Sequence, residues 1–429
     1  MNNFNRRDFI KLMGISAASV ATPSLLKAAT GNVAPRVVVV GSGFAGSTVA
    51  KYLRLWSGNM IDVIVIDPKT SHVSCVMSNL VVNGKLNMSD ITFDHSVLSD
   101  NYGVQFIKGM VTGVGPDAEG GKVVSYNTGP GTTIKQKKCD YVVLAPGIAM
   151  DEIPGWDQNI APHAWIAGEQ TTLLKSQLEA IPAGGTVVMT VPKAPYRCPP
   201  GPYERACVIA DIMKRKGGGR VVVLDMNSKI IVEEHMFSTA FSDIYADIVE
   251  YIPNVIVERV DGLTIKTTTD SYTADVLNVI PTHKAGKIIT ELGYASINES
   301  WADVNPISYE LKSDKGIFVI GDSSGTNQPK SGHMANSQAK VCADAIIRMI
   351  ANQPIDDLQR LSNLTTNSAC YSPITFNTAT WLTAGFAYDQ DLEKMVAIKK
   401  SLGQAEMHSI DHYQDMFSWS QNLFENSFM

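Results

Sequence analysis

The chain has 429 residues, of which 45% are hydrophobic and 18% are charged, and its formal net charge at pH 7 is −6. This length is enough for two or three domains with sizeable cores. The acidic balance argues against nucleic acid and anionic membranes as partners, and no apolar run beyond the N-terminal region is long enough to form a transmembrane segment.

Residues 1–29 have the pattern of a twin-arginine signal peptide. Arg6 and Arg7 precede an apolar stretch from Leu12 to Leu26, and Ala28-Ala29 offers a cleavage site. Such a signal exports folded proteins, so we expect a periplasmic protein that receives its cofactor before export. The alternative is a basic amphipathic start to a cytosolic domain. Removing the four basic residues and one aspartate of this segment would change the net charge from −6 to −9.

The first predicted unit behind this segment is a nucleotide-binding βαβ motif. A strand of valines, Arg36–Val40, leads into Gly41-Ser-Gly43-Phe-Ala-Gly46 and then into a helix over Ser47–Trp56. A second strand over Ile61–Ile66 ends at Asp67, at the spacing needed to reach a ribose hydroxyl. With both strands, the helix and the acidic residue in place, the motif predicts a bound dinucleotide.

A second α/β unit follows, but its nucleotide site lacks the expected turn. Strand Thr186–Val191 should lead into a glycine-rich loop, whereas the chain continues with Pro192-Lys-Ala-Pro195 and Cys198-Pro199-Pro200. Proline has no N–H to offer a pyrophosphate, so we expect no NAD(P)H site here. Its other elements are predicted as strands Arg220–Asp225 and Val255–Val260 and helices Tyr203–Lys216 and Glu233–Ile252.

The chain then returns to the first unit. Gly316-Ile-Phe-Val-Ile-Gly-Asp322 is a strand ending in Gly-Asp, and in flavoproteins with two dinucleotide folds such an Asp322 holds the ribityl chain of FAD. Lys330 opens a segment that leads into a helix reaching roughly Ile350, whose N-terminal dipole can face the flavin.

The predicted fold class is α/β, with two Rossmann-like dinucleotide-binding-type domains plus a C-terminal α+β interface domain. The FAD-binding domain comprises residues 35–150 and 283–352. The second Rossmann-like domain, without an NAD(P)H motif, comprises 151–282. Residues 353–429 form the C-terminal flavin-pocket and partner-interface domain.

Several motifs carry a family resemblance. They are Arg197-Cys198-Pro-Pro-Gly-Pro-Tyr-Glu-Arg205, Cys75-Val-Met-Ser-Asn79, Pro329-Lys-Ser-Gly332, Asn367-Ser-Ala-Cys370-Tyr371 and Trp419. In these motifs the chain resembles the flavoprotein subunit of flavocytochrome c sulfide dehydrogenase. That family lies beside the sulfide:quinone oxidoreductases among the glutathione-reductase-like flavoproteins.

The resemblance implies roles for individual residues. Cys198 and Cys370 would form a redox disulfide beside the flavin, Cys75 would link FAD covalently, and Trp419 would pack near the isoalloxazine ring. With the glycines of the first motif, Asp67, Asp322 and Lys330, these complete the expected cofactor site. It also implies sulfide as substrate, a c-type cytochrome subunit as partner in a heterodimer, and a periplasmic location.

The residues around Cys198 suggest how the site works. Pro199 should hold Cys198 in an extended conformation, and Arg197 and Arg205 should favour its thiolate and attract HS⁻. Glu204, six residues after Cys198, either moves protons during thiol exchange or is a solvated carboxylate at a helix start, and the sequence leaves both open.

Of the remaining cysteines, Cys207 and Cys342 lie in apolar helical patterns that predict core packing, and Cys139 precedes a strand and is expected to be structural. No His/Cys cluster has zinc-ligand spacing, so we expect no metal site.

The predicted function is therefore flavin-dependent oxidation of sulfide to zero-valent sulfur or polysulfide, with electrons passed to a c-type cytochrome. One alternative is a sulfide:quinone oxidoreductase, but the tail from Ser401 to Met429 has no Lys or Arg with which to bind anionic lipid. A second is an NAD(P)H-dependent disulfide reductase, which the proline-filled turn opposes. A third is a non-catalytic FAD electron-transfer subunit.

Overall fold

A five-stranded parallel sheet forms the centre of the first domain. The structure is a computed structural model that describes residues 34–429, so the predicted signal peptide lies outside the described residues. The strands run in the order β19-β9-β1-β2-β5. Their bounds are β1 Arg36–Val40, β2 Asp62–Asp67, β5 Gln105–Lys108, β9 Tyr141–Leu144 and β19 Ile317–Val319. The predicted strands at 36–40 and 61–66 are confirmed to within one residue.

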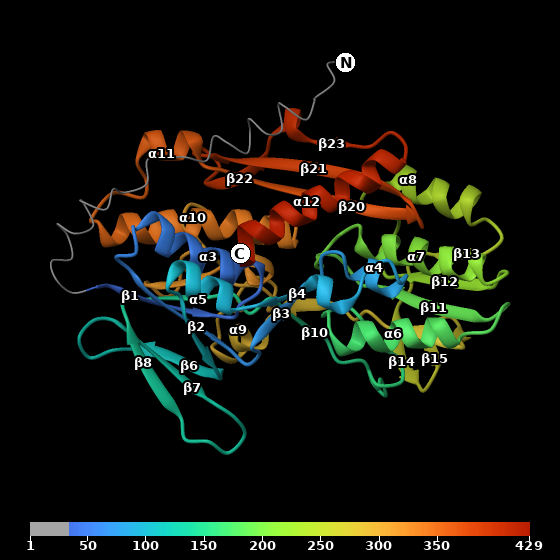
Figure 1. The fold of residues 1–429 in the computed structure, drawn as a ribbon, viewed down its shortest axis with the longest axis horizontal. Coiled ribbons are helices and arrows are strands. Elements are labelled where there is room, and N and C mark those ends of the chain that lie inside the picture. The colour runs from blue at the N-terminus through green and yellow to red at the C-terminus, as the bar shows by residue number, and fades with distance from the viewer. Residues whose placement is uncertain (1–33) are drawn as a thin grey trace.

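Helices α3 (Phe44–Trp56) and α10 (Gly332–Ile350) pack side by side in this domain (Figure 1). Helix α3 begins three residues earlier than predicted, directly after Gly43. The close approach of the helices requires glycine at 332, because a Cβ there would lie 2.9 Å from the Phe44 ring. An antiparallel sheet of β6 (Met110–Pro116), β7 (Lys122–Asn127) and β8 (Lys135–Cys139) extends from the domain.

The second domain is built on another parallel sheet, in the order β13-β12-β11-β17. The strands are β11 Thr186–Val191, β12 Arg220–Asp225, β13 Val249–Ile252 and β17 Val276–Asn278. Helix α7 (Gly201–Arg215) follows β11, close to the predicted range.

Two predictions for this domain need correction. The helix predicted over 233–252 consists of α8 (Glu234–Thr239) and a short π-helical turn to Ile244, and its last residues form β13. The strand predicted over 255–260 is β14 (Val257–Asp261), which pairs with β15 (Thr264–Thr267) in a separate antiparallel sheet. The exposed Glu258 and Arg259 explain this, because a central parallel strand is buried on both faces.

Two chain crossings join the domains. Strand β10 (Ile148–Met150) pairs antiparallel with β18 (His283–Ala285), so the chain leaves and re-enters the first domain through one two-stranded ribbon. The predicted boundaries after residues 150 and 282 lie at this ribbon. No helix within residues 34–429 has both the length and the apolar content needed to cross a bilayer.

The C-terminal region is an antiparallel sheet with one long helix. Its elements are β20 Thr365–Thr375, β21 Thr378–Asp389, β22 Lys394–Ala397, β23 Gly403–Gln404 and α12 Ile410–Phe428. The β20–β21 hairpin packs over α10 and α7, and α12 runs back to α3 (Figure 1). This hairpin therefore contacts both Rossmann-like domains at once.

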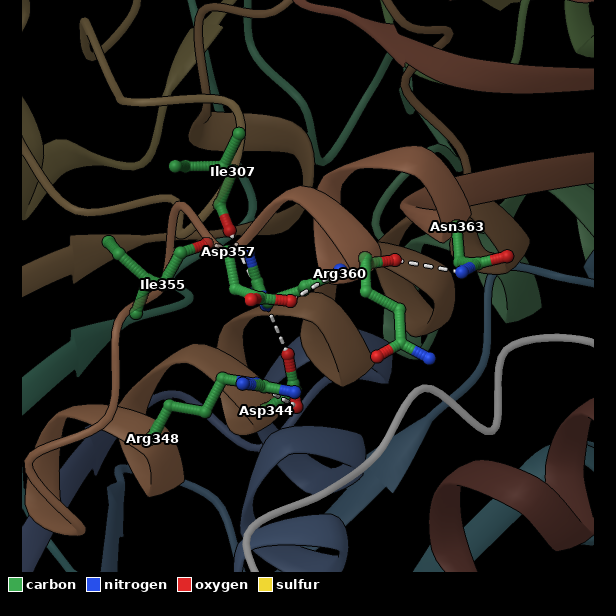
Figure 2. A network of polar contacts seen from close by, with 8 residues as sticks. Ile307, Asp344, Arg348, Ile355, Asp357, Arg360 and Asn363 are labelled. Atoms are coloured by element: carbon green, nitrogen blue, oxygen red, sulfur yellow. Dashed lines mark hydrogen bonds and ion pairs between the residues drawn. The ribbon is translucent and has the colours of Figure 1, made fainter.

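A buried polar network fastens the C-terminal region to α10. Arg360, on α11 (Leu358–Asn363), is 1% exposed and forms an ion pair with Asp344 of α10 at 2.6 Å (Figure 2). Its guanidinium also donates to the carbonyl oxygens of Ile307 and Ile355 at 2.9 and 2.7 Å. Arg348 contacts the other oxygen of Asp344 at 3.2 Å. The buried carboxylate is thus paired on both sides, as burial of a charge requires.

Candidate active site

A cavity opens where the three regions meet. Its empty space, open mouth included, amounts to about 750 Å³. Its lining comes from the loop before α4 (Ser78–Val82), the start of α7, the start of α10, β20 and α12. Five of the predicted site residues line it together: Cys75, Cys198, Glu204, Cys370 and Trp419. They come from positions as far apart as 75 and 419.

Cys198 lies in the turn between β11 and α7, in a conformation that differs from the prediction. Its φ is 61°, which is left-handed and not extended. Two backbone hydrogen bonds hold this strained geometry: the Cys198 N–H donates to the Lys330 carbonyl at 2.7 Å, and its carbonyl accepts from Gly201 at 2.9 Å. Strain of this kind persists where the surroundings over-determine it, commonly at functional sites.

The sulfur of Cys198 packs onto the first turn of α7. A Cβ at Gly201 would lie 2.8 Å from Cys198 Sγ and 2.8 Å from the Trp165 ring, so only glycine fits at this helix start. Positive charge at a helix N-terminus favours a thiolate. The arrangement therefore places the sulfur where a negative charge can be stabilised when it forms.

In the structure, the thiols themselves are neutral. Burial raises the pKa of Cys198 well above its usual value, and the neighbouring Cys370 and Glu204 raise it further, whereas Arg197 opposes them. Burial also raises the pKa of Cys370 to about 12. Arg197 therefore favours the thiolate, as predicted, but burial outweighs it. The guanidinium of Arg205 is buried and bonded to Asn79, Asn278 and the Ala164 carbonyl, and a Cys198 thiolate would still interact favourably with it.

Cys370 lies on β20 and lines the cavity. All six cysteines are free thiols, so the predicted disulfide between Cys198 and Cys370 is not formed in this structure. Cys75 lines the same cavity, in the loop after β3 (Ser71–Val73), where its carbonyl accepts from the Ser78 hydroxyl at 2.8 Å. Cys139, Cys207 and Cys342 are buried in the domain cores, which confirms that prediction.

Glu204 is not the solvated carboxylate that the sequence allowed. It projects from the first turn of α7 into the cavity, where its Oε1 accepts from Asn79 Nδ2 at 2.7 Å. Desolvation raises its pKa to about 7, against the opposing effects of Asn79, Arg205 and Ser372. A carboxyl group that titrates near neutral pH beside two thiols can exchange protons with them. Asn79 was not singled out from the sequence, although it ends one of the motifs quoted above.

Trp419 and His333 form one wall of the cavity. Trp419 Nε1–H donates to His333 Nδ1 at 3.2 Å, and the Ala369 N–H donates to the same nitrogen at 3.1 Å. His333 therefore carries its ring proton on Nε2. Burial lowers its pKa to about 4, so the imidazole stays neutral at physiological pH. The Tyr371 ring packs against Trp419 with centroids 5.5 Å apart.

The glycine-rich loop of the first domain has the close packing that a dinucleotide site needs. A Cβ at Gly41 would lie 2.5 Å from the Ala145 carbonyl oxygen, and one at Gly46 would lie 1.9 Å from the Gly41 carbonyl oxygen. Gly43 caps α3, so the helix N-terminus faces the loop. Asp67 ends β2, and its carboxylate accepts from the Ser42 N–H at 2.8 Å, which places it at this loop.

Asp322 and Lys330 lie beside each other at the edge of this site. Asp322 Oδ1 is buried and has no hydrogen-bond partner in the described part of the chain. A buried orphan acceptor of this kind fits the hydroxyl groups of a ribityl chain. Lys330 Nζ, in contrast, donates to the carbonyls of Asp322 and Ser324 at 2.8 and 2.9 Å. Lys330 therefore anchors this loop, and its own carbonyl holds Cys198.

The second domain also has a carboxylate at the position that corresponds to Asp67, but its hydrogen bonds are already made within the domain. Asp225 ends β12, where a nucleotide-binding unit would present its ribose-binding carboxylate. It is fully buried and accepts hydrogen bonds from the hydroxyls of Tyr203 and Tyr251, both at 2.8 Å, and from Asn227. Asn227 also bonds the proline-containing turn at Pro192. The sequence drew attention to the prolines but not to this saturated carboxylate.

The fold and the site together define a flavoprotein with two dinucleotide-binding folds and a thiol-lined redox cavity. A family profile for the central part of the sulfide dehydrogenase (flavocytochrome c) flavoprotein chain matches residues 171–281, and one for pyridine nucleotide-disulphide oxidoreductases matches residues 35–179.

Individual relatives point the same way. The sulfide dehydrogenase (flavocytochrome c) flavoprotein chain of Chlorobaculum thiosulfatiphilum is 52% identical over 46 residues, which are 11% of this chain and 94% of that sequence. The mitochondrial sulfide:quinone oxidoreductase of Dictyostelium discoideum is 20% identical over 346 residues, 75% of this chain and 72% of that one. The crystal structure of the Aquifex aeolicus sulfide:quinone oxidoreductase shares the fold, with a TM-score of 0.72 at 17% identity and 92% coverage of both chains.

The chain belongs to the sulfide dehydrogenase and sulfide:quinone oxidoreductase-like flavoproteins, a family of sulfide-oxidising flavin enzymes.

Proposed function

We propose that the protein is the flavoprotein chain of a sulfide dehydrogenase, which oxidises sulfide to zero-valent sulfur or polysulfide and passes the electrons to a c-type cytochrome subunit. The observation that carries the proposal is the convergence of Cys198, Cys370 and Glu204 on one cavity, which Gly332 at the start of α10 also lines. The glycine cradle and Asp322 Oδ1 would hold FAD. When bound, FAD accepts an electron pair and releases it in single steps.

Cys198, Cys370 and Glu204 each have a separate role in the proposed oxidation of sulfide. In the oxidised enzyme, HS⁻ attacks one sulfur of a Cys198–Cys370 disulfide. A new S–S bond forms as the old one breaks, leaving a persulfide on one cysteine and a thiolate on the other. The persulfide proton passes to Glu204, whose pKa of about 7 suits a proton acceptor. The α7 N-terminus stabilises the charge if Cys198 is the thiolate.

Two features support the cytochrome over a quinone as acceptor. The central family profile and the Chlorobaculum relative are both flavocytochrome c chains. Helix α12 carries no Lys or Arg with which to bind an anionic lipid surface.

A further feature argues against NAD(P)H as the electron donor. The Asp225 carboxylate already accepts hydrogen bonds from Tyr203 and Tyr251, which supports the absence of an NAD(P)H site in the second domain.

The test is anaerobic reduction of the purified holoprotein. Sulfide should bleach the flavin and NADH should not. Cys198→Ser should abolish bleaching by sulfide, whereas Cys207→Ser, at a core cysteine outside the cavity, should leave it intact. Added cytochrome c should then be reduced faster than a soluble quinone. Bleaching by NADH, or by sulfide in Cys198→Ser, would overturn the assignment.

Covalent attachment through Cys75 is part of the proposal and has its own test. After acid precipitation, flavin should stay in the pellet of the wild-type protein and appear in the supernatant of Cys75→Ala. Yellow supernatants from both proteins would show that the flavin is held without a covalent bond.

We also propose that residues 1–29 direct export of the folded holoprotein to the periplasm. Replacing both arginines, Arg6→Lys with Arg7→Lys, should leave the flavoprotein in the cytoplasm of the producing cell, as cell fractionation would show. Undiminished export of the double variant would refute the twin-arginine route.

A further inference from the structure

A second buried carboxylate lies behind the cavity, outside its lining. Glu233 directly precedes α8, is 6% exposed and has a left-handed backbone with φ 48°. Its Oε1 accepts from the Thr380 hydroxyl at 2.8 Å, and its Oε2 is buried with no hydrogen-bond partner among the described residues. A strained residue that buries a half-satisfied carboxylate costs stability, which suggests a use other than packing.

Polar side chains connect Glu233 to the cavity along the β20–β21 hairpin. Cys370 and Ser372 lie on the same face of β20, because side chains two apart share a face. Ser372 is directly opposite Thr380 in the antiparallel register, and side chains so placed have their Cβ atoms about 5 Å apart. The Ser372 hydroxyl is close enough to Glu204 to lower the pKa of that carboxyl, and its oxygen is buried without a partner at normal hydrogen-bond geometry in the described part of the chain.

Among the described residues, no cation contributes to the pKa shift of Glu233. The groups close enough to interact with it are Glu204 and Cys207 on α7, Cys370 on β20 and Thr380 on β21. The adjacent Glu234 is exposed and pairs with Lys229 at 2.6 Å. Burial raises the pKa of Glu233 to about 7, the same value as that of Glu204. Two carboxyl groups of matched proton affinity can exchange a proton without a large energy cost.

We propose that Glu233 is a proton-relay residue that carries the proton released at Glu204, by way of the Ser372 and Thr380 hydroxyls, to solvent beside α8. The inference rests on the proposed function. Over a full turnover, HS⁻ and two oxidised cytochromes c give zero-valent sulfur, one proton and two reduced cytochromes c, so one proton must leave the site for every two cytochromes reduced. In the relay, each hydroxyl donates its proton onward as it accepts one, and the Thr380 hydroxyl already donates towards Glu233. Glu233 touches neither substrate nor flavin, so its effect is on proton removal alone.

The test uses the holoprotein and two relay variants, Glu233→Gln and Thr380→Val, with Glu234→Gln as the control at the exposed neighbour. Anaerobic turnover with sulfide and excess cytochrome c, in weak buffer with a pH-indicator dye, follows cytochrome reduction and proton release together. In the wild type and the control we expect the two signals to coincide. In both relay variants we expect proton release to lag behind cytochrome reduction, kcat to fall about fivefold or more with KM for sulfide unchanged, and the pH dependence near pH 7 to flatten.

The outcomes separate this inference from the proposed function. If sulfide fails to bleach the wild type, the proposed function falls, and the relay with it. If it bleaches the wild type and proton release stays synchronous in the relay variants, the relay alone is refuted. Should Glu233→Gln fail to fold, Thr380→Val decides the question, because it removes the hydroxyl and leaves the carboxylate in place.

Discussion

Replacing Glu204 by glutamine should change how the stability of the protein depends on pH. The folded state raises the pKa of this carboxyl from 4.5 to about 7, chiefly by desolvation. Between pH 4.5 and pH 7 the Glu204 carboxyl is protonated in the folded state and ionised in the unfolded chain. Stability is therefore lost as pH rises from 4.5 to 7, and the loss is complete above pH 7.

The magnitude follows from the size of the shift. At 1.36 kcal/mol per pKa unit, the full shift corresponds to about 3 kcal/mol. Solvent reaching the carboxylate through the cavity mouth lowers the expected value to about 2 kcal/mol. Glutamine keeps an oxygen that can accept a hydrogen bond from Asn79, but its amide cannot ionise. The Glu204→Gln variant should therefore not show this loss of stability as pH rises. At pH 8 the variant should be as stable as the wild type or more so.

Urea denaturation of both proteins at pH 5 and pH 8, at equal flavin content, measures the difference. The free energy of unfolding of the wild type, relative to that of Glu204→Gln, should fall by about 2 kcal/mol between these conditions. Glu234→Gln, at an exposed site, should follow the wild type. If Glu204→Gln and the wild type lose equal stability from pH 5 to pH 8, the desolvated carboxyl group described here is refuted.

Two further substitutions test the cofactor cradle and the buried network. Gly41→Ala should lose FAD at least tenfold more readily on dialysis, because its Cβ would lie 2.5 Å from a backbone carbonyl oxygen, whereas Gly115→Ala, with no atom within 4 Å, should retain it; equal retention would contradict the cradle. Arg360→Met should lower the free energy of unfolding by about 3 kcal/mol, because Asp344 loses a buried partner. A thermal midpoint within a degree of wild type would show that the pair contributes nothing.

Local patterns were enough to predict the first nucleotide motif and the class of fold. The valines of β1, the glycines that follow and Asp67 act within about thirty residues of chain, where spacing dictates geometry. The same reasoning failed at β13 and β14. Residues 249–252 are too few to distinguish a strand from the end of a helix, and their pairing with β12 decides it. Residues 257–261 do form a strand, but the charged Glu258 and Arg259 suit an antiparallel sheet with an exposed face and not the buried parallel sheet.

The sequence by itself determined the two dinucleotide folds, the proline-filled turn and the motifs that carry the family resemblance, because each depends on residues close together in the chain. Only the tertiary structure decided that Cys198 adopts a left-handed turn, that burial keeps its thiol neutral, and that Asp225 is saturated by Tyr203 and Tyr251. It alone placed Glu233 behind Cys370. Desolvation and long-range hydrogen bonds depend on which distant segments pack together, and no local pattern records that.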